Sequence, residues 1–524
     1  MRKLLLFTFL LYSFSSFCQQ QAYWVFFTDK NQVSFNPYAY FTPEAIQRRV
    51  RNHAPVIDST DFPVREDYVH RVAEICGNSG YTTRWFNGVG VEATQQQVAQ
   101  LESLPFVKSV FPQQVAYWQP ANMEPDTFNA KYDLSFRKEH QLNLFGDNLF
   151  AKNNIDGSGI TIGIFDAGFI GIKEHEAFTH IMTAGKVKAT YDFVRHDSDV
   201  YSHGADHGCM VMSCVSGKMK DMSLGLAPGA TFILARVARE YGNQYRGEEY
   251  FIAALEWADK LGVDIINVSG GPNEKSYFAE QMDGKTALIS RGANMAARKG
   301  ILVVAAAGNN GDYEEPFLLP PSEADSALSI TATNDYGFIS SYSSYGPTPD
   351  FRRKPDLCAP GTMIVAVPSK IYKNSFDVME GTSFSAPLVS GFAACVMQMY
   401  RDIPVMALMD TLRKNATLYP YFDYSHGYGI PYIPNYFDHP AQKQNISITA
   451  DPNTIRFVYS DSCYCPSKDH PDFLYYAVEY EGKILKYHVV MMTNAGPYSI
   501  PREDIPEGSK VYVHFRNSYA EQQL

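Results

Sequence analysis

Residues 381–387 read GTSFSAP and lead into an apolar stretch of small residues that continues to Met399. Pro387 suits the first turn of a helix, so Ser383 is predicted to lie at or just before a helix N-terminus. The helix dipole and the backbone N–H groups of a first turn stabilise a developing oxyanion. Taken alone, a serine before a proline-led helix is more often only a cap. The pattern also differs from the Gly-x-Ser-x-Gly elbow of α/β-hydrolases, because Ser385 stands where the second glycine would be.

A serine hydroxyl is a poor nucleophile unless a base takes its proton and a carboxylate orients that base. His207 begins the segment HGCMVMS, which is predicted to be a helix lined with small residues, and Asp166 ends the strand-like segment IFD. Each motif is weak by itself, since a histidine before glycine is usually structural and an aspartate at a strand end is often a turn residue. Together they occur along the chain in the order Asp, His, Ser. That order matches the subtilisin arrangement and neither the chymotrypsin nor the α/β-hydrolase one.

The region that holds these residues, about 130 to 436, alternates apolar runs with stretches of helical spacing. Strand-like runs occupy residues 160–165, 231–237, 263–268, 301–306 and 328–333, and helical spacing occupies 248–261 and 285–299. Strands that are apolar on both faces and alternate with helices predict an α/β fold with a doubly wound parallel sheet. Function in such sheets lies beyond the carboxyl ends of the strands, which is where Asp166 and Asn309 fall.

Two smaller domains are predicted to flank this one, since 524 residues exceed one ordinary core. The N-terminal region mixes short strands with helices, one of them opened by Thr42 as N-cap and Pro43 in the first turn. The C-terminal region has short alternating strands and predicts a β-sandwich. The predicted organisation is a signal peptide at 1–18, an α+β domain at 19–125, a catalytic domain at 126–437 and a C-terminal domain at 438–524.

The first residues are typical of a secretory signal. A positive start at residues 2–3 precedes an apolar stretch at 4–14, which is too short to span a bilayer, and small residues precede a predicted cut before Gln19. The alternatives are a membrane anchor, a buried helix, or a lipid-modified Cys18, against which the bulky Phe17 argues. We expect an exported protein, secreted or associated with the cell envelope, with no transmembrane segment in its mature form.

Composition excludes some functions and leaves others open. The net charge of −11 argues against nucleic-acid binding, and the short basic runs at 48–51 and 352–354 are more typical of solvated faces than of binding patches. Eight cysteines in 524 residues do not make a disulfide-dense scaffold. Cys463 and Cys465 lack a matching second pair and predict no zinc site. No cofactor is required, and no metal ligand can be named.

The three segments around Asp166, His207 and Ser383 resemble the signature motifs of the subtilase family of serine peptidases. Residues 225–230, GLAPGA, resemble the family's loop after the histidine helix, and residues 305–309, AAAGN, resemble its oxyanion segment. The resemblance covers about 150 to 400, with all motifs in order. It implies a hydrolase that cleaves peptide bonds through an acyl-enzyme, and it leaves room for structural calcium with no identifiable ligands.

The resemblance also implies roles for single residues. Asp166 would orient His207, His207 would take the proton of Ser383, and the Asn309 amide would join the Ser383 N–H in binding the oxyanion. One wall of the S1 pocket, which also pairs with the substrate backbone, would consist of Ser269, Gly270 and Gly271; the other would consist of Ala306, Ala307 and Gly308. The S1 floor would come from the loop that holds Asp312, Glu314, Glu315 and Phe317, which we interpret as a solvated acidic loop.

Two departures from the family pattern stand out. Cys209 replaces the usual threonine near the catalytic histidine, which we interpret as a small buried residue; the alternative is an enzyme that a mercurial would inhibit. Gly270 stands where leucine is common, so substrate pairing is expected to differ locally.

The N-terminal region resembles a subtilase propeptide in position and size, with cleavage expected around 118 to 130. Protein or peptide substrates and the chain's own propeptide, acting as an intramolecular inhibitor, are the expected partners. The alternative is an ordinary accessory domain. For the whole chain, the alternatives to a self-processed endopeptidase are a catalytically silent binding or regulatory protein and an esterase with the same triad; the peptide-pairing edge at 269–271 argues against the esterase.

Overall fold

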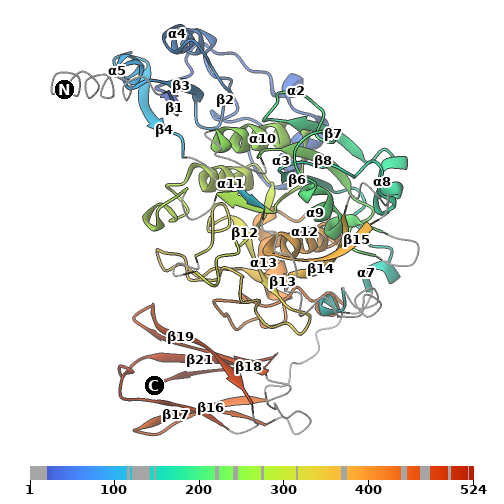
Figure 1. The fold of residues 1–524 in the computed structure, drawn as a ribbon, viewed down its shortest axis with the longest axis vertical. Helices are drawn as coiled ribbons and strands as arrows, with labels where there is room; N and C mark the ends of the chain where they lie inside the picture. Colours follow the sequence, from blue (N-terminus) through green and yellow to red (C-terminus); the bar gives the residue numbers. More distant parts are fainter. Residues whose placement is uncertain are drawn as a thin grey trace, which may run out of the picture.

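The computed structural model of the protein describes most of the chain, and the predicted signal peptide lies outside the described part. The described residues are 20–114, 118–120, 142–146, 149–218, 223–239, 246–272, 276–313, 317–367, 375–437, 445–460, 472–493, 497–516 and 518–524. Figure 1 shows an α+β body at the N-terminal end, a larger central α/β body and an all-β body at the C-terminal end. Within the described ranges, no helix combines the length and the apolar character needed to cross a membrane.

The central body is built on a seven-stranded parallel sheet with the strand order β13-β12-β11-β9-β6-β8-β7. The strands are β6 (Thr161–Asp166), β7 (Val187–Asp192), β8 (Thr231–Arg236), β9 (Ile265–Val268), β11 (Leu302–Ala306), β12 (Ala327–Thr333) and β13 (Leu357–Pro360). Because alternate residues of a strand point to opposite faces, Leu302 and Val304 pack into one core cluster and Val303 and Ala305 into the other. Both faces are therefore apolar and both need a covering layer.

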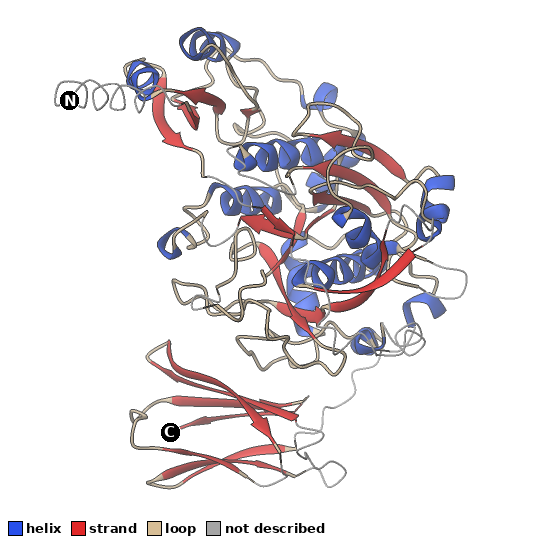
Figure 2. Ribbon diagram, viewed as in Figure 1, coloured by secondary structure: helices blue, strands red, loops and turns tan. Residues whose placement is uncertain are grey.

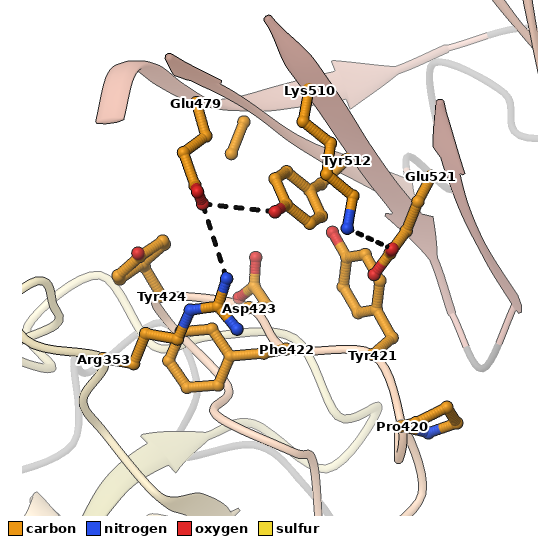
Figure 3. A pocket seen from close by; sticks show the side chains of 11 residues that line it. Arg353, Pro420, Tyr421, Phe422, Asp423, Tyr424, Glu479, Lys510, Tyr512 and Glu521 are labelled. Atoms are coloured by element: carbon orange, nitrogen blue, oxygen red, sulfur yellow. Dashed lines mark hydrogen bonds and ion pairs between the residues drawn. The ribbon is translucent and has the colours of Figure 1, made fainter. Parts of the chain in front are cut away.

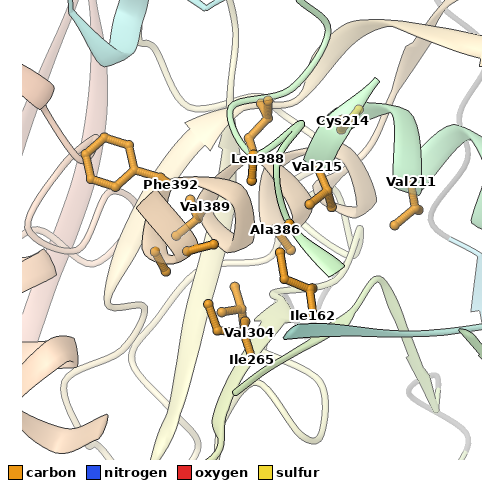
Figure 4. Close-up of a cluster of buried hydrophobic side chains, with 14 of the residues drawn as sticks. Ile162, Val211, Cys214, Val215, Ile265, Val304, Ala386, Leu388, Val389 and Phe392 are labelled. Carbon is orange, nitrogen blue, oxygen red and sulfur yellow. The ribbon is translucent and has the colours of Figure 1, made fainter. Parts of the chain in front are cut away.

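Helices supply these two layers, so the predicted doubly wound parallel sheet is confirmed. The helices α9 (His207–Ser216) and α12 (Thr382–Met399) pack on one face, with α13 (Val405–Lys414) beside α12. The helices α10 (Gly247–Leu261) and α11 (Leu288–Arg298) pack on the other. In Figure 4, Val389 of α12 lies over Val304 and Ile265 of the sheet. Shorter elements complete this body: α7 (Leu149–Lys152), α8 (Thr179–Thr183) and the hairpin of β14 (Thr362–Val367) and β15 (Ser375–Glu380).

The N-terminal body is an antiparallel sheet in the order β2-β3-β1-β4 with helices packed against it. Its strands are β1 (Gln21–Phe27), β2 (Thr82–Thr83), β3 (Gly88–Ala93) and β4 (Val107–Pro112), and its helices are α2 (Pro37–Tyr40), α3 (Pro43–Arg51), α4 (Glu66–Cys76) and α5 (Gln95–Glu102). Thr42 caps α3 as predicted, since its side chain accepts a hydrogen bond from Ala45 N. One further strand, β5 (Trp118–Pro120), leaves this body and pairs with β10 (Gly270–Pro272) of the central one.

The described residues of the C-terminal body form strands and loops without a helix, as Figure 2 shows, and the predicted β-sandwich is confirmed. One sheet holds β16 (Ile446–Ala450), β17 (Thr454–Tyr459) and β20 (Tyr498–Pro501). The other has the order β19-β18-β21-β22 and holds β18 (Asp472–Tyr480), β19 (Lys483–Met492), β21 (Lys510–Phe515) and β22 (Ser518–Gln523). A single apolar cluster fills the space between the two sheets.

The interpretation of the basic run at 48–51 as a solvated face is wrong. Arg48 and Arg49 are 1% and 0% exposed and lie between the N-terminal body and α10. Arg49 binds both carboxylate oxygens of Asp61, at 2.8 and 2.9 Å, and one oxygen of Asp259 at 2.6 Å. Arg48 pairs with Asp259 and also donates to the carbonyls of Val263 and Lys299. Buried charge is tolerated here because each guanidinium is paired and hydrogen-bonded.

The run at 352–354 is not simply solvated either. Lys354 is buried and pairs with Asp356 at 2.7 Å, and Arg352 pairs with Glu323, Asp325 and Asp350. The exposed Arg353 reaches Glu479 of the C-terminal body at 3.5 Å. These three cations therefore hold loops and domains together.

Candidate active site

Asp166 and His207 meet at the carboxyl edge of the central sheet. Asp166 is the last residue of β6, and His207 is the first residue of α9, so a strand end and a helix start bring the two side chains together. The His207 Nδ1 atom lies 2.8 Å from Asp166 Oδ1, and both side chains are 1% exposed. Since a carboxylate only accepts, Nδ1 carries the proton and Nε2 keeps a lone pair. Among the described residues, Nε2 has no hydrogen-bond partner, so it is available as a base.

The approach of these two elements depends on glycine. Gly208 follows His207, and its N–H donates to the carbonyl of Gly168 at 3.0 Å. A Cβ on Gly208 would lie 2.4 Å from that same carbonyl oxygen, and backbone cannot yield as a flexible side chain would. Any larger residue at 208 would therefore push His207 away from Asp166.

Ser383 is the second residue of α12, one turn deeper in the helix than the position of Pro387 predicts. The helix begins at Thr382, so Pro387 lies in its second turn rather than in its first. Proline has no N–H for the carbonyl four residues back, which is that of Ser383. Ser269 supplies the missing donor, since its hydroxyl donates to Ser383 O at 2.9 Å. A side chain of the neighbouring strand end thus makes the proline tolerable and fixes the backbone of Ser383.

The Ser383 hydroxyl itself donates to the backbone carbonyl of Ser269 at 2.6 Å. It therefore does not engage His207 Nε2 in this arrangement and must turn about its Cα–Cβ bond before that base can take its proton. Behind Ser269, Asn267 donates to the Ser269 hydroxyl at 2.8 Å and accepts from Ser390 of α12 at 3.0 Å. This buried chain of hydrogen bonds ties β9 to α12. Sequence reasoning missed Asn267 and Ser390, because neither belongs to a motif.

Asn309 follows β11 at the same edge of the sheet, and its amide has a defined orientation. Asn309 Oδ1 accepts hydrogen bonds from Thr382 N at 3.1 Å and from the Thr382 hydroxyl at 2.9 Å. The Thr382 hydroxyl also accepts from Gly308 N at 3.3 Å. Because Thr382 takes the oxygen end, the nitrogen end of the amide is directed elsewhere as a donor. Thr382 is thus a positioning residue whose only sequence signal is that it precedes Ser383.

The predicted substrate-pairing edge is occupied by the chain itself. β10 pairs antiparallel with β5, and Gly270 lies opposite Pro120, Gly271 opposite Gln119 and Pro272 opposite Trp118. An extended segment from the end of the N-terminal body therefore adds a strand to the edge that begins next to Ser269. An enzyme that cleaves extended peptides would bind its substrate backbone in this way.

The two predicted walls of the S1 pocket lie next to each other in the sheet, since β9 pairs with β11 and leads into β10. Ala307 is buried, and Gly308 has a φ of 110°, which suits glycine at this turn. Of the predicted floor, Asp312 is exposed and Phe317 packs beside a small cluster that includes Tyr277 and Leu319. Glu314 and Glu315 lie outside the described residues.

Cys209 lies in α9 directly after Gly208 and is fully buried in the core cluster that covers one face of the sheet. Burial raises the pKa of the Cys209 thiol, which disfavours the reactive thiolate. Both properties agree with the interpretation of Cys209 as a small core residue.

The helix α10 holds the N-terminal body through a row of buried acidic side chains. Glu256 accepts from Thr83 Oγ1 and from the backbone N–H groups of Arg84 and Trp85, at 2.6 to 3.1 Å. One turn or more away, Glu248 accepts from Gln114 N at 3.2 Å and Glu249 from Tyr81 N at 2.5 Å. Asp259 completes the row through the Arg48 and Arg49 contacts described above. Of these carboxylates, Glu248 holds the backbone at Gln114, the last described residue before the gap that precedes β5.

Glu248 gives this contact a pH dependence. Burial raises the pKa of its carboxyl to about 6, against hydrogen bonds from Tyr277 and Gln114 that lower it. A carboxyl group with a raised pKa stabilises the folded state at pH values below the ordinary pKa of glutamate. This stabilisation is lost as the pH rises through about 6, and the free energy of unfolding then falls by roughly 2 kcal/mol. We expect Glu248→Gln to raise the melting temperature of the intact chain at pH 8 by several degrees and to change it little at pH 4. An equal rise at both pH values would contradict this origin.

The parallel α/β domain brings an aspartate–histidine pair to the same sheet edge as a serine in the first turn of a helix. This combination of fold and site is that of a serine hydrolase. Comparison with protein families specifies the class further. Residues 157–429, just over half of the chain, match the subtilase family, and residues 22–127 match the Peptidase S8 propeptide domain of Bacteroidota. The chain belongs to the subtilase family, which is a family of serine-type endopeptidases.

Curated relatives agree with this assignment. Serine protease AprX of Bacillus subtilis (strain 168) is 26% identical over 291 residues, which are 50% of this chain and 62% of AprX. The thermophilic serine proteinase of Bacillus sp. (strain AK1) is 28% identical over 346 residues, 65% of this chain and 76% of the relative. Subtilisin DY of Bacillus licheniformis is 30% identical over 264 residues, 50% of this chain and 85% of the relative.

Solved structures share the fold at low sequence identity. Fervidolysin from Fervidobacterium pennivorans, a keratinolytic enzyme related to subtilisin, superposes with a TM-score of 0.57 at 16% identity and covers 94% of this chain and 70% of its own. The epidermin leader peptide processing serine protease EpiP from Staphylococcus aureus gives a TM-score of 0.55 at 15% identity, with 81% of this chain and 99% of its own covered.

Proposed function

We propose that the chain is the precursor of an exported serine endopeptidase that uses Asp166, His207 and Ser383 as its catalytic triad. The observation that carries the proposal is the 2.8 Å contact of Asp166 with His207 Nδ1, because it leaves Nε2 as a base at the edge where α12 presents Ser383. Export rests on the N-terminal sequence and on the exported character expected of a zymogen of this family.

The reaction would begin when an extended peptide pairs with the backbone of 270–272, in the place that β5 now takes. A substrate N–H that binds Ser269 O would displace the Ser383 hydroxyl from that carbonyl and let it turn toward His207. His207 would accept the hydroxyl proton as Ser383 Oγ bonds to the scissile carbonyl carbon. The carbonyl oxygen would become an oxyanion, bound by the Asn309 amide and the Ser383 N–H. His207 would then protonate the departing amine, and water would hydrolyse the acyl-enzyme through the same steps.

The register of β5 supports a proposed site at which the precursor would cut itself. Gly271 pairs with Gln119 and Gly270 with Pro120, so a peptide bound in this register would bring the residue after the one opposite Gly270 to Ser269, beside the nucleophile. In the sequence the residue after Pro120 is Ala121, and a small side chain suits a pocket with walls of alanine and glycine. We therefore expect self-cleavage between Ala121 and Asn122, with the cleaved segment retained as an inhibitor on the substrate edge.

Active-site labelling with a fluorophosphonate, followed by intact mass measurement, tests the proposal. The wild-type chain is expected to be labelled on Ser383 and to yield a new N-terminus at Asn122, and Ser383→Ala is expected to show neither. An unlabelled and unprocessed wild-type chain that is folded would favour a silent binding protein. A labelled chain that hydrolyses esters but no peptides would favour the esterase.

Asn309→Ala tests the oxyanion contact separately. We expect kcat to fall by about 10² to 10³, the range known for the corresponding donor in subtilisin, with little change in KM. Thr382→Val, which keeps the shape but removes the hydroxyl that orients Asn309, is expected to give a smaller loss of the same kind. Steady-state kinetics on a peptide substrate separate kcat from KM, and a rise in KM alone would contradict a role in the transition state.

A further inference from the structure

Three side chains of the kind that bind metal ions meet where the C-terminal sandwich packs on the catalytic domain. Asp423 and His426 belong to the catalytic-domain segment after α13, and His514 belongs to β21 of the sandwich. They are 2%, 4% and 2% exposed, and one potential ligand atom from each lies within 4.8 Å of the others. Figure 3 shows Asp423 on the loop below the strands that carry Tyr512 and Lys510.

The hydrogen bonds of His426 decide which of its nitrogens carries a proton. Its Nε2 lies 3.1 Å from the carbonyl oxygen of Gly337, and a carbonyl only accepts, so Nε2 is the donor. In the neutral ring, Nδ1 then holds a lone pair. That lone pair lies 3.0 Å from Asp423 Oδ1, which is also only an acceptor when the carboxylate is ionised. The hydroxyl of Ser425, at 3.0 Å from Nδ1, is placed to share its one hydrogen between the two.

His514 repeats the arrangement from the other domain. Its Nδ1 faces the carbonyl oxygen of Arg516 at 3.4 Å, which makes Nδ1 the donor. Its Nε2 is buried, has no hydrogen-bond partner among the described residues and points at Asp423 Oδ2 from 3.5 Å. Two imidazole lone pairs thus converge on one carboxylate. With both rings neutral, the lone pairs and the carboxylate repel one another, and a metal ion between the three groups, or a proton on a ring nitrogen that faces Asp423, removes this repulsion.

We propose that Asp423, His426 and His514 bind one zinc ion that joins the C-terminal domain to the catalytic domain. Ligand atoms about 2.0–2.1 Å from a tetrahedral zinc are roughly 3.3 Å apart. His426 Nδ1 lies 3.0 Å from Asp423 Oδ1 and His514 Nε2 lies 3.5 Å from Oδ2, so each histidine has one carboxylate oxygen near that spacing. Two nitrogen ligands exclude calcium and magnesium, which take oxygen. The outer ring nitrogens donate to Gly337 and Arg516 carbonyls, as ligating histidines usually do.

One more polar group of the cluster borders the three proposed ligands. The Tyr487 hydroxyl of β19 lies 3.1 Å from both Asp423 oxygens and 2.5 Å from the Ser425 hydroxyl. Tyr475 of β18 stacks on the His514 ring with centroids 4.5 Å apart and meets the His426 ring edge-on at 4.7 Å, which closes the site to solvent. A closed site with protein ligands is typical of structural zinc rather than of a catalytic one. The site would therefore act on domain docking and is independent of the proposed peptidase mechanism.

The zinc content of the purified full-length chain, measured by elemental mass spectrometry after dialysis without chelator, tests the proposal. We expect about one zinc per chain in the wild type and less than about a tenth of that in His514→Gln and in His426→Gln. His488→Gln is the matched control, because His488 is an exposed histidine on the neighbouring strand β19, and it is expected to keep its zinc.

A second measurement covers the case in which a variant fails to fold. Wild-type chain stripped with a chelator and titrated with Co²⁺ is expected to give the visible bands of a four-coordinate nitrogen and oxygen site, and zinc chloride is expected to abolish them and raise the melting temperature. A wild-type chain that takes up neither metal at micromolar concentration would overturn the proposal and assign a shared proton to the cluster. Zinc that persists in both histidine variants would equally overturn it.

Discussion

Replacing His207 with alanine is expected to lower kcat for peptide hydrolysis by on the order of 10⁶, the magnitude established for the triad base of subtilisin itself. The physical reason is that Nε2 of His207 is the base that the described residues place at this edge, and without it the Ser383 hydroxyl remains hydrogen-bonded to Ser269 O. Self-cleavage after Ala121 depends on the same base, so we expect the variant to accumulate as the uncut precursor.

The measurement is kinetic and needs a mature variant. Chains cut in trans by a tagged wild-type protein, which is then removed, can be compared on one fluorogenic peptide. His203→Ala is the control, because His203 is an exposed histidine four positions earlier, and its activity should match the wild type. A His207→Ala chain that still processes itself would show that Asp166 and His207 form only a structural pair.

Asp166→Asn is expected to lower kcat by about 10⁴, which is a smaller loss than the one expected for His207→Ala. Asp166 Oδ1 accepts from His207 Nδ1 and from Ala167 N, at 2.8 and 2.7 Å. An asparagine can keep the bond to Ala167 but can present its NH₂ to Nδ1, which then reverses the tautomer and puts the proton on Nε2. The order of the two losses therefore separates a base from the residue that orients it. Equal losses would contradict the tautomer assignment.

The sequence predicts those strands and helices whose pattern of apolar residues reflects how they are buried. Five apolar runs became β6, β8, β9, β11 and β12, because central parallel strands are buried on both faces. The two edge strands, β7 and β13, were not predicted, and the reason differs between them. β7 is only partly buried and alternates polar with apolar residues, and β13 has four residues and ends in proline.

Side chains that act through distant partners could not be predicted from local pattern. The motif around Ser383 located the nucleophile, but nothing near Pro387 indicates that Ser269 supplies its missing hydrogen-bond donor. The same limit explains why His514 was not recognised as a candidate ligand, since its partners lie in another domain. Arg49 belongs with these cases, because Asp259 lies 210 positions away.

Arg49→Ala is expected to release the cleaved N-terminal domain at least 10² times faster. The guanidinium is fully buried and neutralises Asp61 of its own domain and Asp259 of α10 at once. Removing one partner of a buried ion pair typically costs about 3–5 kcal/mol, because the charge left behind stays desolvated. Asp61 retains Lys299 at 2.9 Å and Asp259 retains Arg48, which places the expected loss at the lower end of that range.

The delay between self-cleavage and the first hydrolysis of an added peptide reports this release, because the cleaved segment holds the substrate edge until it leaves. Arg71→Ala is the matched control: Arg71 pairs with Glu74 at 2.7 Å on an exposed face of α4, where such pairs contribute about 0–1 kcal/mol, so its delay should barely change.

Part of the Arg49 effect falls on the N-terminal domain itself, through Asp61. The double variant Arg49→Ala with Asp259→Ala separates the two parts, since only the coupling between these residues crosses the interface. A shortened delay without coupling between Arg49 and Asp259 would mean that Arg49 stabilises the fold of the N-terminal domain and does not contribute to its binding to α10.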